Sequence, residues 1–178
     1  MIRLKQILRE MSSPDIRQCL DKIQRKQFRL IGAGDNGRVY EIDGEDKVFK
    51  ITKEQDEYAV AERIVNRYKD FTCFIPVYYV DGKNMYIMAN AEELSQPIKK
   101  TIDSFMREYA VFARENGGEV SIFDFIAETK ISDPVFDNFL NTLQIEVEKL
   151  NIPDLDLDLD FRSENMMIWN GNMVLVDW

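Results

Sequence analysis

The stretch from Phe28 to Ile51 (FRLIGAGDNGRVYEIDGEDKVFKI) constrains the fold more than any other part of the sequence. It contains a GxGxxG motif that begins at Gly32 and ends at Gly37, with β-forming residues on both sides. A second turn signal, Asp43-Gly44, separates the second β-forming run from a third. In a dinucleotide-binding fold a GxGxxG motif opens a helix, whereas here β-forming runs flank it. The stretch therefore predicts three strands joined by two tight turns.

Helical and strand-forming patterns alternate in the rest of the chain. Apolar residues recur at helical spacing in residues 1–27, where Ser13 is a favourable N-cap and Pro14 follows it in the first turn. Residues 54–69 form another helical pattern with an apolar stripe. The remaining expected elements are strands at FIPVYYV and NMYIMA joined by Asp81-Gly82, a helix from Pro97 to about Asn116, a break at Gly117-Gly118, one or two helices in 121–150, and two short strands around Asn170-Gly171-Asn172.

Composition and charge oppose several classes of function. The net charge of −9 opposes a nucleic-acid-binding surface, which needs clustered lysine and arginine. No apolar run approaches the roughly 18 residues of a membrane span. The chain has no histidine, and Cys19 and Cys73 are isolated, which opposes a zinc site and any Ser-His or Cys-His catalytic pair. We therefore expect a cytoplasmic protein with reduced thiols that binds neither nucleic acid nor membrane.

Lys50 lies in the third predicted strand, thirteen residues after Gly37 and between apolar residues. Taken alone, the glycine motif fits a plain hairpin as well as a phosphate-binding loop, and the lysine fits a side chain that extends to solvent. Together they favour a lysine that reaches the phosphates of a nucleotide. Such a lysine needs a carboxylate partner, and the next helix offers Glu57 and Glu62, about 140° apart around the helix. We favour Glu57, because it begins the apolar stripe.

The C-terminal part combines acidic residues, an amide and a hairpin in a specific order. Asp158-Leu159-Asp160-Phe161 is followed by Arg162, by Asn165 and then by MMIWNGNMVLVDW, in which Asp177 ends an apolar strand. Here the sequence resembles the protein kinase superfamily. The catalytic-loop motif H-R-D-L-x-x-x-N of that family lines up with residues 158–165, and its D-F-G aspartate lines up with Asp177. The Asp-Trp pair is more similar to small-molecule and atypical kinases than to eukaryotic protein kinases.

The resemblance covers about residues 28–178, with the motifs in the order of the family. It implies an α+β, protein-kinase-like, two-lobed fold. Residues 1–27 would form an N-terminal helical segment, and residues 28–92 an N-lobe with a five-stranded antiparallel sheet and one helix. Residues 93–178 would form a minimal, mostly helical C-lobe that carries the catalytic loop and the metal-binding aspartate.

The resemblance also implies ATP and Mg²⁺ as cofactors and assigns roles to individual residues. Lys50 would bind the α- and β-phosphates and Glu57 would orient it. Asp160 would accept the proton of the attacking hydroxyl, and Arg162 would neutralise the transferred phosphoryl group. Asn165 and Asp177 would hold Mg²⁺. The implied nucleotide-binding residues are Gly32, Ala33, Gly34, Asp35, Asn36, Gly37, Val39, Lys50, Glu57, Met88 and Asn90, with Met88–Ala91 as the hinge that reads adenine.

The sequence departs from the family pattern in three ways. Asp158 replaces the histidine of the catalytic loop, or it belongs to the alternating DLDLDLD run and points to solvent. A calcium loop in this run is disfavoured, because it lacks the glycine turn and the bidentate glutamate. Trp178 replaces the phenylalanine of D-F-G, and no glycine follows. The activation segment does not appear either, so we expect no platform for a peptide substrate from these residues.

Three functions fit this pattern. The first is an ATP- and Mg²⁺-dependent phosphotransferase that acts on a hydroxyl of a protein or small molecule. The second is a catalytically silent kinase-fold module that binds and regulates a partner. The third is nucleotidyl transfer with ATP in a reversed orientation. The first is favoured, because every group needed for metal–ATP chemistry is present.

Overall fold

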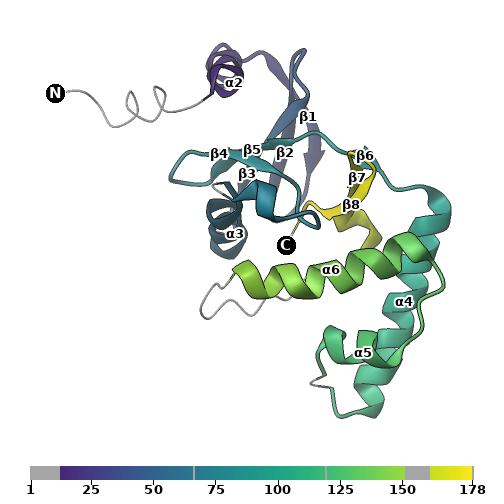
Figure 1. Cartoon of the computed structure of the whole chain (residues 1–178). Helices are drawn as coiled ribbons and strands as arrows, with labels where there is room; N and C mark the ends of the chain where they lie inside the picture. The colour runs from purple at the N-terminus through teal and green to yellow at the C-terminus, as the bar shows by residue number, and fades with distance from the viewer. Residues whose placement is uncertain (1–12, 66, 119, 151–160, 178) are drawn as a thin grey trace. The chain divides into compact units, whose positions relative to one another are not determined.

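The computed structural model describes residues 13–65, 67–118, 120–150 and 161–177. The contacts within the chain divide it into two compact units. The first, here the sheet unit, comprises residues up to Tyr68 together with Pro76–Asn90. The second, here the helical unit, comprises Lys69–Ile75 together with the residues from Ala91 onward. Figure 1 shows the helices and strands of both units.

The sheet unit is built on five antiparallel strands in the order β1-β2-β3-β5-β4. The turns at Gly44 and Gly82 have φ values of 67° and 74°, which glycine adopts without strain. The predicted α+β fold class and the predicted five-stranded antiparallel sheet are confirmed. The strands are β1 (Phe28–Ala33), β2 (Gly37–Ile42), β3 (Lys47–Thr52), β4 (Val77–Val80) and β5 (Met85–Ala89).

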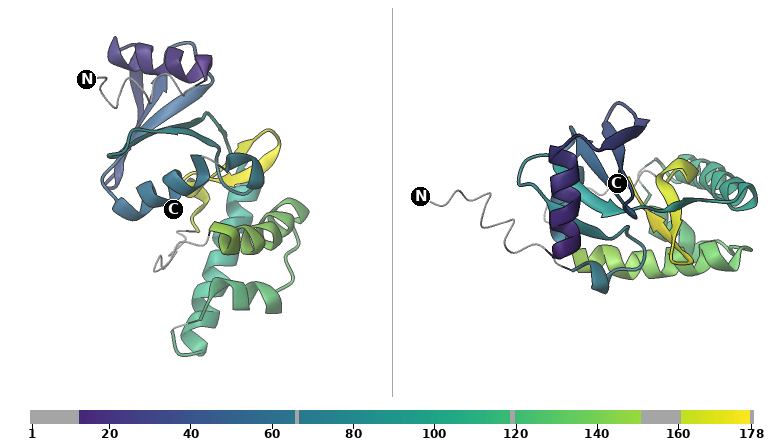
Figure 2. Two further views of the ribbon diagram at one scale, coloured as in Figure 1. Left: turned by 60° about the vertical axis from the view of Figure 1, so that its left-hand side comes forward. Right: turned by 90° about the horizontal axis from the view of Figure 1, so that it is seen from above.

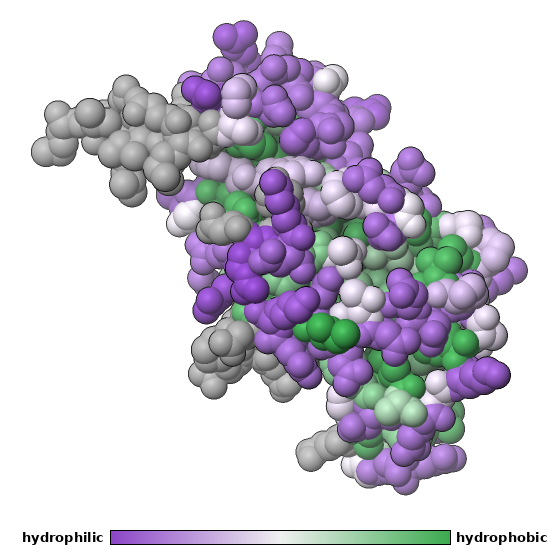
Figure 3. All heavy atoms as spheres, viewed as in Figure 1, coloured by the Kyte–Doolittle hydropathy of each residue, from purple (hydrophilic) through white to green (hydrophobic). Residues whose placement is uncertain are grey.

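Helix α2 (Pro14–Gln24) covers one face of this sheet. It begins as predicted, because the Ser13 side chain accepts a hydrogen bond from the N–H of Ile16 at 3.4 Å. Its buried residues pack against the sheet in a cluster that consists of Ile16, Cys19, Leu20, Ile42, Phe49 and Ile87. The outer surface of α2 is mostly hydrophilic (Figure 3). The earlier part of the predicted N-terminal helical segment, residues 1–12, lies outside the described residues.

Helix α3 (Gln55–Val65) packs against the opposite face of the sheet, as Figure 2 shows. It ends at Val65, before the predicted residue 69, and a short 3₁₀ helix follows at Tyr68–Asp70. Successive residues of a strand point to opposite faces, so Phe49 faces α2 while Lys50 faces α3. The two helices therefore give the sheet one apolar face and one face that contains a buried charge.

The helical unit has three main helices and a small sheet. The helices are α4 (Gln96–Glu115), α5 (Ile122–Glu128) and α6 (Pro134–Leu150), and the rings of Phe105, Phe125 and Phe136 pack together between them. The predicted C-terminal hairpin is confirmed, with its turn at Asn170-Gly171 in positive φ. The strands pair in the order β6-β7-β8, in which β6 (Glu92–Glu93) was not predicted and the others are β7 (Met166–Trp169) and β8 (Asn172–Leu175).

Residues 69–75 belong to the helical unit, although the strand pattern FIPVYYV predicted that the fourth strand begins at Phe74. The strand begins instead at Val77, because Phe74 forms a parallel bridge with Leu175. The N–H of Leu175 donates to the Cys73 carbonyl at 2.8 Å, and the N–H of Ile75 donates to the Leu175 carbonyl at 2.9 Å. Among the described residues, no helix is both long and apolar enough to cross a bilayer.

Gly37 and Gly34 form a matched pair for testing the glycine loop. A Cβ atom on Gly37 would lie 2.5 Å from the carbonyl oxygen of Ile51, whereas one on Gly34 would meet nothing within 4 Å. We expect Gly37→Ala to lower the free energy of unfolding by about 1–3 kcal/mol, because β2 must move away from β3. Gly34→Ala should leave stability nearly unchanged. Urea unfolding of both variants measures this, and equal losses would contradict the register of β2 on β3.

The two cysteines predict a loss of stability at alkaline pH. Burial raises the pKa of the Cys19 thiol from 9.0 to about 11 and that of the Cys73 thiol to about 12. The native state therefore keeps both thiols protonated where the unfolded state ionises. Their contribution to stability is complete below pH 9 and is lost as pH rises toward 11–12. Urea midpoints between pH 8 and pH 11 should fall, and the fall should be smaller in Cys19→Ala and Cys73→Ala variants.

Candidate functional site

Lys50 is a buried cation in the middle of the sheet unit. In β3 it lies opposite Val39 of β2 and opposite Tyr86 of β5. Its side chain does not extend to solvent, since the residue is only 4% exposed and Nζ lies 2.7 Å from Oε1 of Glu57. Removing two charges from water is unfavourable unless their geometry and hydrogen bonds compensate for the lost hydration. The pair therefore depends on the groups around it.

Glu57, and not Glu62, contacts Lys50. Glu57 lies in the first turn of α3 and is 1% exposed, whereas Glu62 lies on the exposed side of the helix. The Tyr86 hydroxyl donates to Oε1 of Glu57, the oxygen that also contacts Lys50. The Thr52 hydroxyl donates to Oε2 at 2.6 Å. Both carboxylate oxygens thus accept hydrogen bonds from residues of the sheet, which compensate for part of the hydration that the buried carboxylate loses.

The glycine loop between β1 and β2 is bound to the end of β3. The N–H of Gly34 donates to the Gly37 carbonyl at 3.0 Å, and the N–H of Lys53 donates to the Asn36 carbonyl at 2.8 Å. The Lys53 ammonium also donates to the Asp35 carbonyl at 2.8 Å. None of the three loop glycines has a positive φ. Packing against β3 explains Gly37, while Gly34 leaves open space where a Cβ would stand.

The predicted hinge follows directly from β5. Met88 is buried and pairs with Val48 of β3. The N–H of Ala89 donates to the Pro76 carbonyl and that of Asn90 to the Asp46 carbonyl, each at 3.0 Å. These two N–H groups are therefore engaged within the sheet unit. Any contact of Asn90 with an adenine would use its carbonyl or its exposed side chain.

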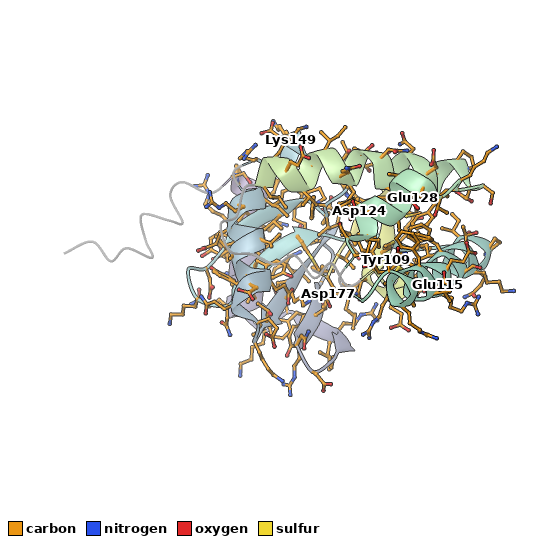
Figure 4. All side chains as sticks on the ribbon, turned by 90° about the horizontal axis from the view of Figure 1, so that it is seen from below. Tyr109, Glu115, Asp124, Glu128, Lys149 and Asp177 are labelled. Carbon is orange, nitrogen blue, oxygen red and sulfur yellow. The ribbon has the colours of Figure 1, made fainter. Side chains whose placement is uncertain are left out.

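The helical unit carries the predicted metal-binding residues on its small sheet. Asn165 ends the 3₁₀ helix Ser163–Asn165 just before β7. Asp177, which Figure 4 labels, follows β8. The N–H of Val176 donates to the Asn165 carbonyl at 2.9 Å, so the backbone joins Asn165 to the neighbour of Asp177. Arg162 is exposed, and its carbonyl accepts from the N–H of Asn165 at 2.9 Å. Within the described part of the chain, no group of three or more acidic, histidine or cysteine side chains is arranged to hold a metal ion.

Two predicted positions of the catalytic loop, Asp158 and Asp160, lie outside the described residues. Phe161, which follows them, is 2% exposed and therefore belongs to the core of the helical unit. The proton-accepting role of Asp160 stays a prediction from the kinase resemblance.

The chain matches no protein-family model and no curated protein sequence. Among solved structures it is similar to one described as the streptomycin–ATP–APH(2")-IIa ternary complex. The similarity covers 94% of this chain and 71% of that chain, with 17% sequence identity and a TM-score of 0.36. At this TM-score the two structures superpose only loosely.

Two residues of the candidate site, Thr52 and Tyr86, were not predicted. Thr52 follows Lys50 by two residues in β3, so strand alternation alone places both on one face. Tyr86 carries no such local signal. It reaches Glu57 because β5 pairs with β3 in the register that sets Tyr86 opposite Lys50, and this pairing joins segments that are far apart in the sequence.

The two glutamates of α3 allow a direct test of the buried pair. Glu57→Gln would leave the Lys50 ammonium buried without its carboxylate, and breaking such a pair costs about 3–5 kcal/mol. Glu62→Gln, on the exposed side of the same helix, should change the free energy of unfolding by less than about 0.5 kcal/mol. Urea unfolding compares the two, and similar losses would show that the pair contributes little.

Proposed function

We propose that the chain is a kinase-like, ATP- and Mg²⁺-dependent phosphotransferase that acts on a hydroxyl group of a protein or small molecule. The observation that carries the proposal is the buried pair of Lys50 and Glu57 next to a glycine loop. A lysine that is held by a helix glutamate on the third strand of a five-stranded antiparallel sheet is the arrangement that protein kinases use to bind ATP phosphates.

The sheet unit has features that suit a nucleotide phosphate. Val39 lies opposite Lys50, so the glycine loop and the lysine belong to adjacent strands. The open space at Gly34 would allow a phosphate oxygen to approach the backbone without meeting a side chain. Lys50 would supply the positive charge, and its contact with Glu57 would keep the ammonium from turning away.

The helical unit has donor groups that suit Mg²⁺. Asn165 offers an amide oxygen and Asp177 a carboxylate, and oxygen ligands of this kind are what Mg²⁺ prefers. Mg²⁺ is usually held by one or two protein groups, with phosphate oxygens and water as its other ligands. Asn165 and Asp177 would therefore be enough protein ligands to hold the ion. When bound, the ion would neutralise phosphate charge, while Asp160 would accept the hydroxyl proton and Arg162 would bind the transferred phosphoryl group.

The alternative function is a catalytically silent kinase-fold module. One observation favours it: the N–H groups of Ala89 and Asn90 are engaged with Pro76 and Asp46, which leaves fewer hinge donors for an adenine. For either function we propose a cytoplasmic location, because Cys19 and Cys73 are both free and buried thiols.

Ligand-induced stabilisation tests nucleotide binding. Addition of ATP and Mg²⁺ at about 100 times Kd should stabilise the native state by about 2.7 kcal/mol and raise Tm by several degrees. The rise should be lost with EDTA and in the Lys50→Ala and Asp177→Ala variants. Lys83→Ala, which changes an exposed lysine of the sheet unit, should retain it. The comparison uses the ligand-induced rise of Tm in each variant, because Lys50→Ala by itself should lower Tm by removing the cation next to the buried Glu57 carboxylate.

Transfer of labelled γ-phosphate then separates catalysis from binding. A turnover that is lost in Asp160→Asn, while the ATP-induced rise in Tm persists, supports the phosphotransferase. The absence of any rise in Tm at millimolar ATP and Mg²⁺ would reject the proposal and favour the silent module.

A further inference from the structure

The carboxylate of Glu57 is held by two hydroxyl groups that come from the sheet itself. Tyr86 of β5 donates to Oε1, and Thr52 of β3 donates to Oε2 at 2.6 Å. We infer that Tyr86 and Thr52 are positioning residues that fix Glu57, and through it the Lys50 ammonium, in the place where a nucleotide phosphate binds. This inference rests on the proposed function. The four side chains are here called the hydroxyl clamp.

The clamp lies in a buried environment, where hydrogen bonds to a charge are strong. Lys50 is 4% exposed, and Thr52 and Glu57 are each 1% exposed. Tyr86 is fully buried. The hydroxyl of a buried tyrosine needs a polar partner, and a phenylalanine would fill the same space without that requirement. The contact with Glu57 therefore explains why a tyrosine suits this position.

Thr52 connects the clamp to two further parts of the sheet unit. Its Oγ1 accepts from the N–H of Glu54 at 3.0 Å, directly before α3 begins. The same oxygen lies 3.3 Å from the carbonyl of Asn36 in the glycine loop, to which the N–H of Lys53 also donates at 2.8 Å. One residue thus joins the loop, the start of α3 and the carboxylate that contacts Lys50.

This connection has a functional consequence. A lysine that is held in one position loses less freedom when a phosphate binds, so the binding is tighter. All four side chains of the clamp belong to the sheet unit, where β3, β5 and α3 bring the Lys50–Glu57 pair together. Loss of either hydroxyl should leave the fold intact but allow Glu57 and Lys50 to separate more often.

The chain offers a matched control for Tyr86→Phe. Tyr58 is also buried, also lies at the contact between α3 and the sheet, and its hydroxyl accepts from the N–H of Gly82 at 2.6 Å. Tyr58→Phe removes a buried hydroxyl from the same helix contact without removing a donor to Glu57. Thr52→Val removes the second hydroxyl at constant size, and Thr52→Ser restores it.

The first measurement needs no nucleotide. The Lys50 amine is labelled with acetic anhydride at a temperature far below Tm. The rate of this labelling is measured by peptide mass spectrometry and compared with the labelling rate of the exposed Lys83. A buried amine reacts through local opening, so its rate follows the stability of the clamp. We expect labelling of Lys50 to be about tenfold faster in Tyr86→Phe and in Thr52→Val. It should be unchanged in Tyr58→Phe and Thr52→Ser.

The second measurement is the Kd for ATP in the presence of Mg²⁺. Tyr86→Phe and Thr52→Val should each raise it by about tenfold, whereas Tyr58→Phe and Thr52→Ser should keep the wild-type value. Equal labelling rates and equal Kd values in Tyr86→Phe and Tyr58→Phe would overturn the inference. So would a Thr52→Ser variant that behaves like Thr52→Val.

The two measurements also separate this inference from the proposed function. If the wild-type protein does not bind ATP but Tyr86→Phe still accelerates labelling of Lys50, the hydroxyl clamp is supported and the phosphotransferase proposal is rejected. If ATP binds and the variants change neither measurement, the phosphotransferase proposal stands and the positioning role of Tyr86 and Thr52 is rejected.

Discussion

The buried ion pair of Lys50 and Glu57 is the interaction on which the sheet unit depends most. A charge in an apolar interior is tolerated only when its partner is fixed and its remaining hydrogen-bonding capacity is used. Here β3 supplies the cation, α3 supplies the anion, and β5 supplies a hydroxyl to the anion. The three elements must therefore pack in one arrangement, because any shift of α3 along the sheet would separate Glu57 from its partners. The opposite face of the sheet contacts α2 through apolar side chains, and such non-directional contacts do not fix the position of α2 in the same way.

The helical unit contains a second buried carboxylate, which is held by hydrogen bonds from a different set of donors. Glu146 of α6 is 3% exposed and accepts hydrogen bonds from the N–H and hydroxyl of Thr72 and from the N–H of Cys73. Backbone and hydroxyl donors thus replace the water that this buried carboxylate would otherwise bind. This contact holds residues 69–75 in place, and Cys73 in turn accepts from the N–H of Leu175 in β8. The strand that precedes Asp177 is thus supported by β7 on one side and by the segment around Cys73 on the other.

Most elements of the fold could be predicted from the sequence, because their signals are local. The turns at Gly44 and Gly82, the Ser13 cap and the hairpin at Gly171 each depend on residues a few positions apart. The preference for Glu57 over Glu62 came from the same kind of signal, an apolar stripe on one helix. What was missed depends on long-range pairing. The contact of Tyr86 with Glu57 spans 29 residues and that of Glu146 with Thr72 spans 74, and neither pattern appears in any short window. The short strand β6 was missed because Glu92-Glu93 has no β-forming character, and only its pairing with β7 makes it a strand.

In the proposed function, binding and transfer of phosphate would depend on partly different residues of this chain, which would make them separable properties. Lys50, its carboxylate and the glycine loop all belong to the sheet unit, so a bound nucleotide phosphate would find its cation and its loop backbone there. Proton removal from a hydroxyl would need a base, and the residue proposed for it, Asp160, lies shortly before Asn165 and Asp177 in the sequence. A change at the proposed base, Asp160, would then remove transfer but retain the affinity that Lys50 and the proposed metal-binding residues provide. The buried pair of Lys50 and Glu57 therefore supports the proposal of nucleotide binding. Phosphoryl transfer would require, in addition, that the proposed acidic residues reach the same phosphate.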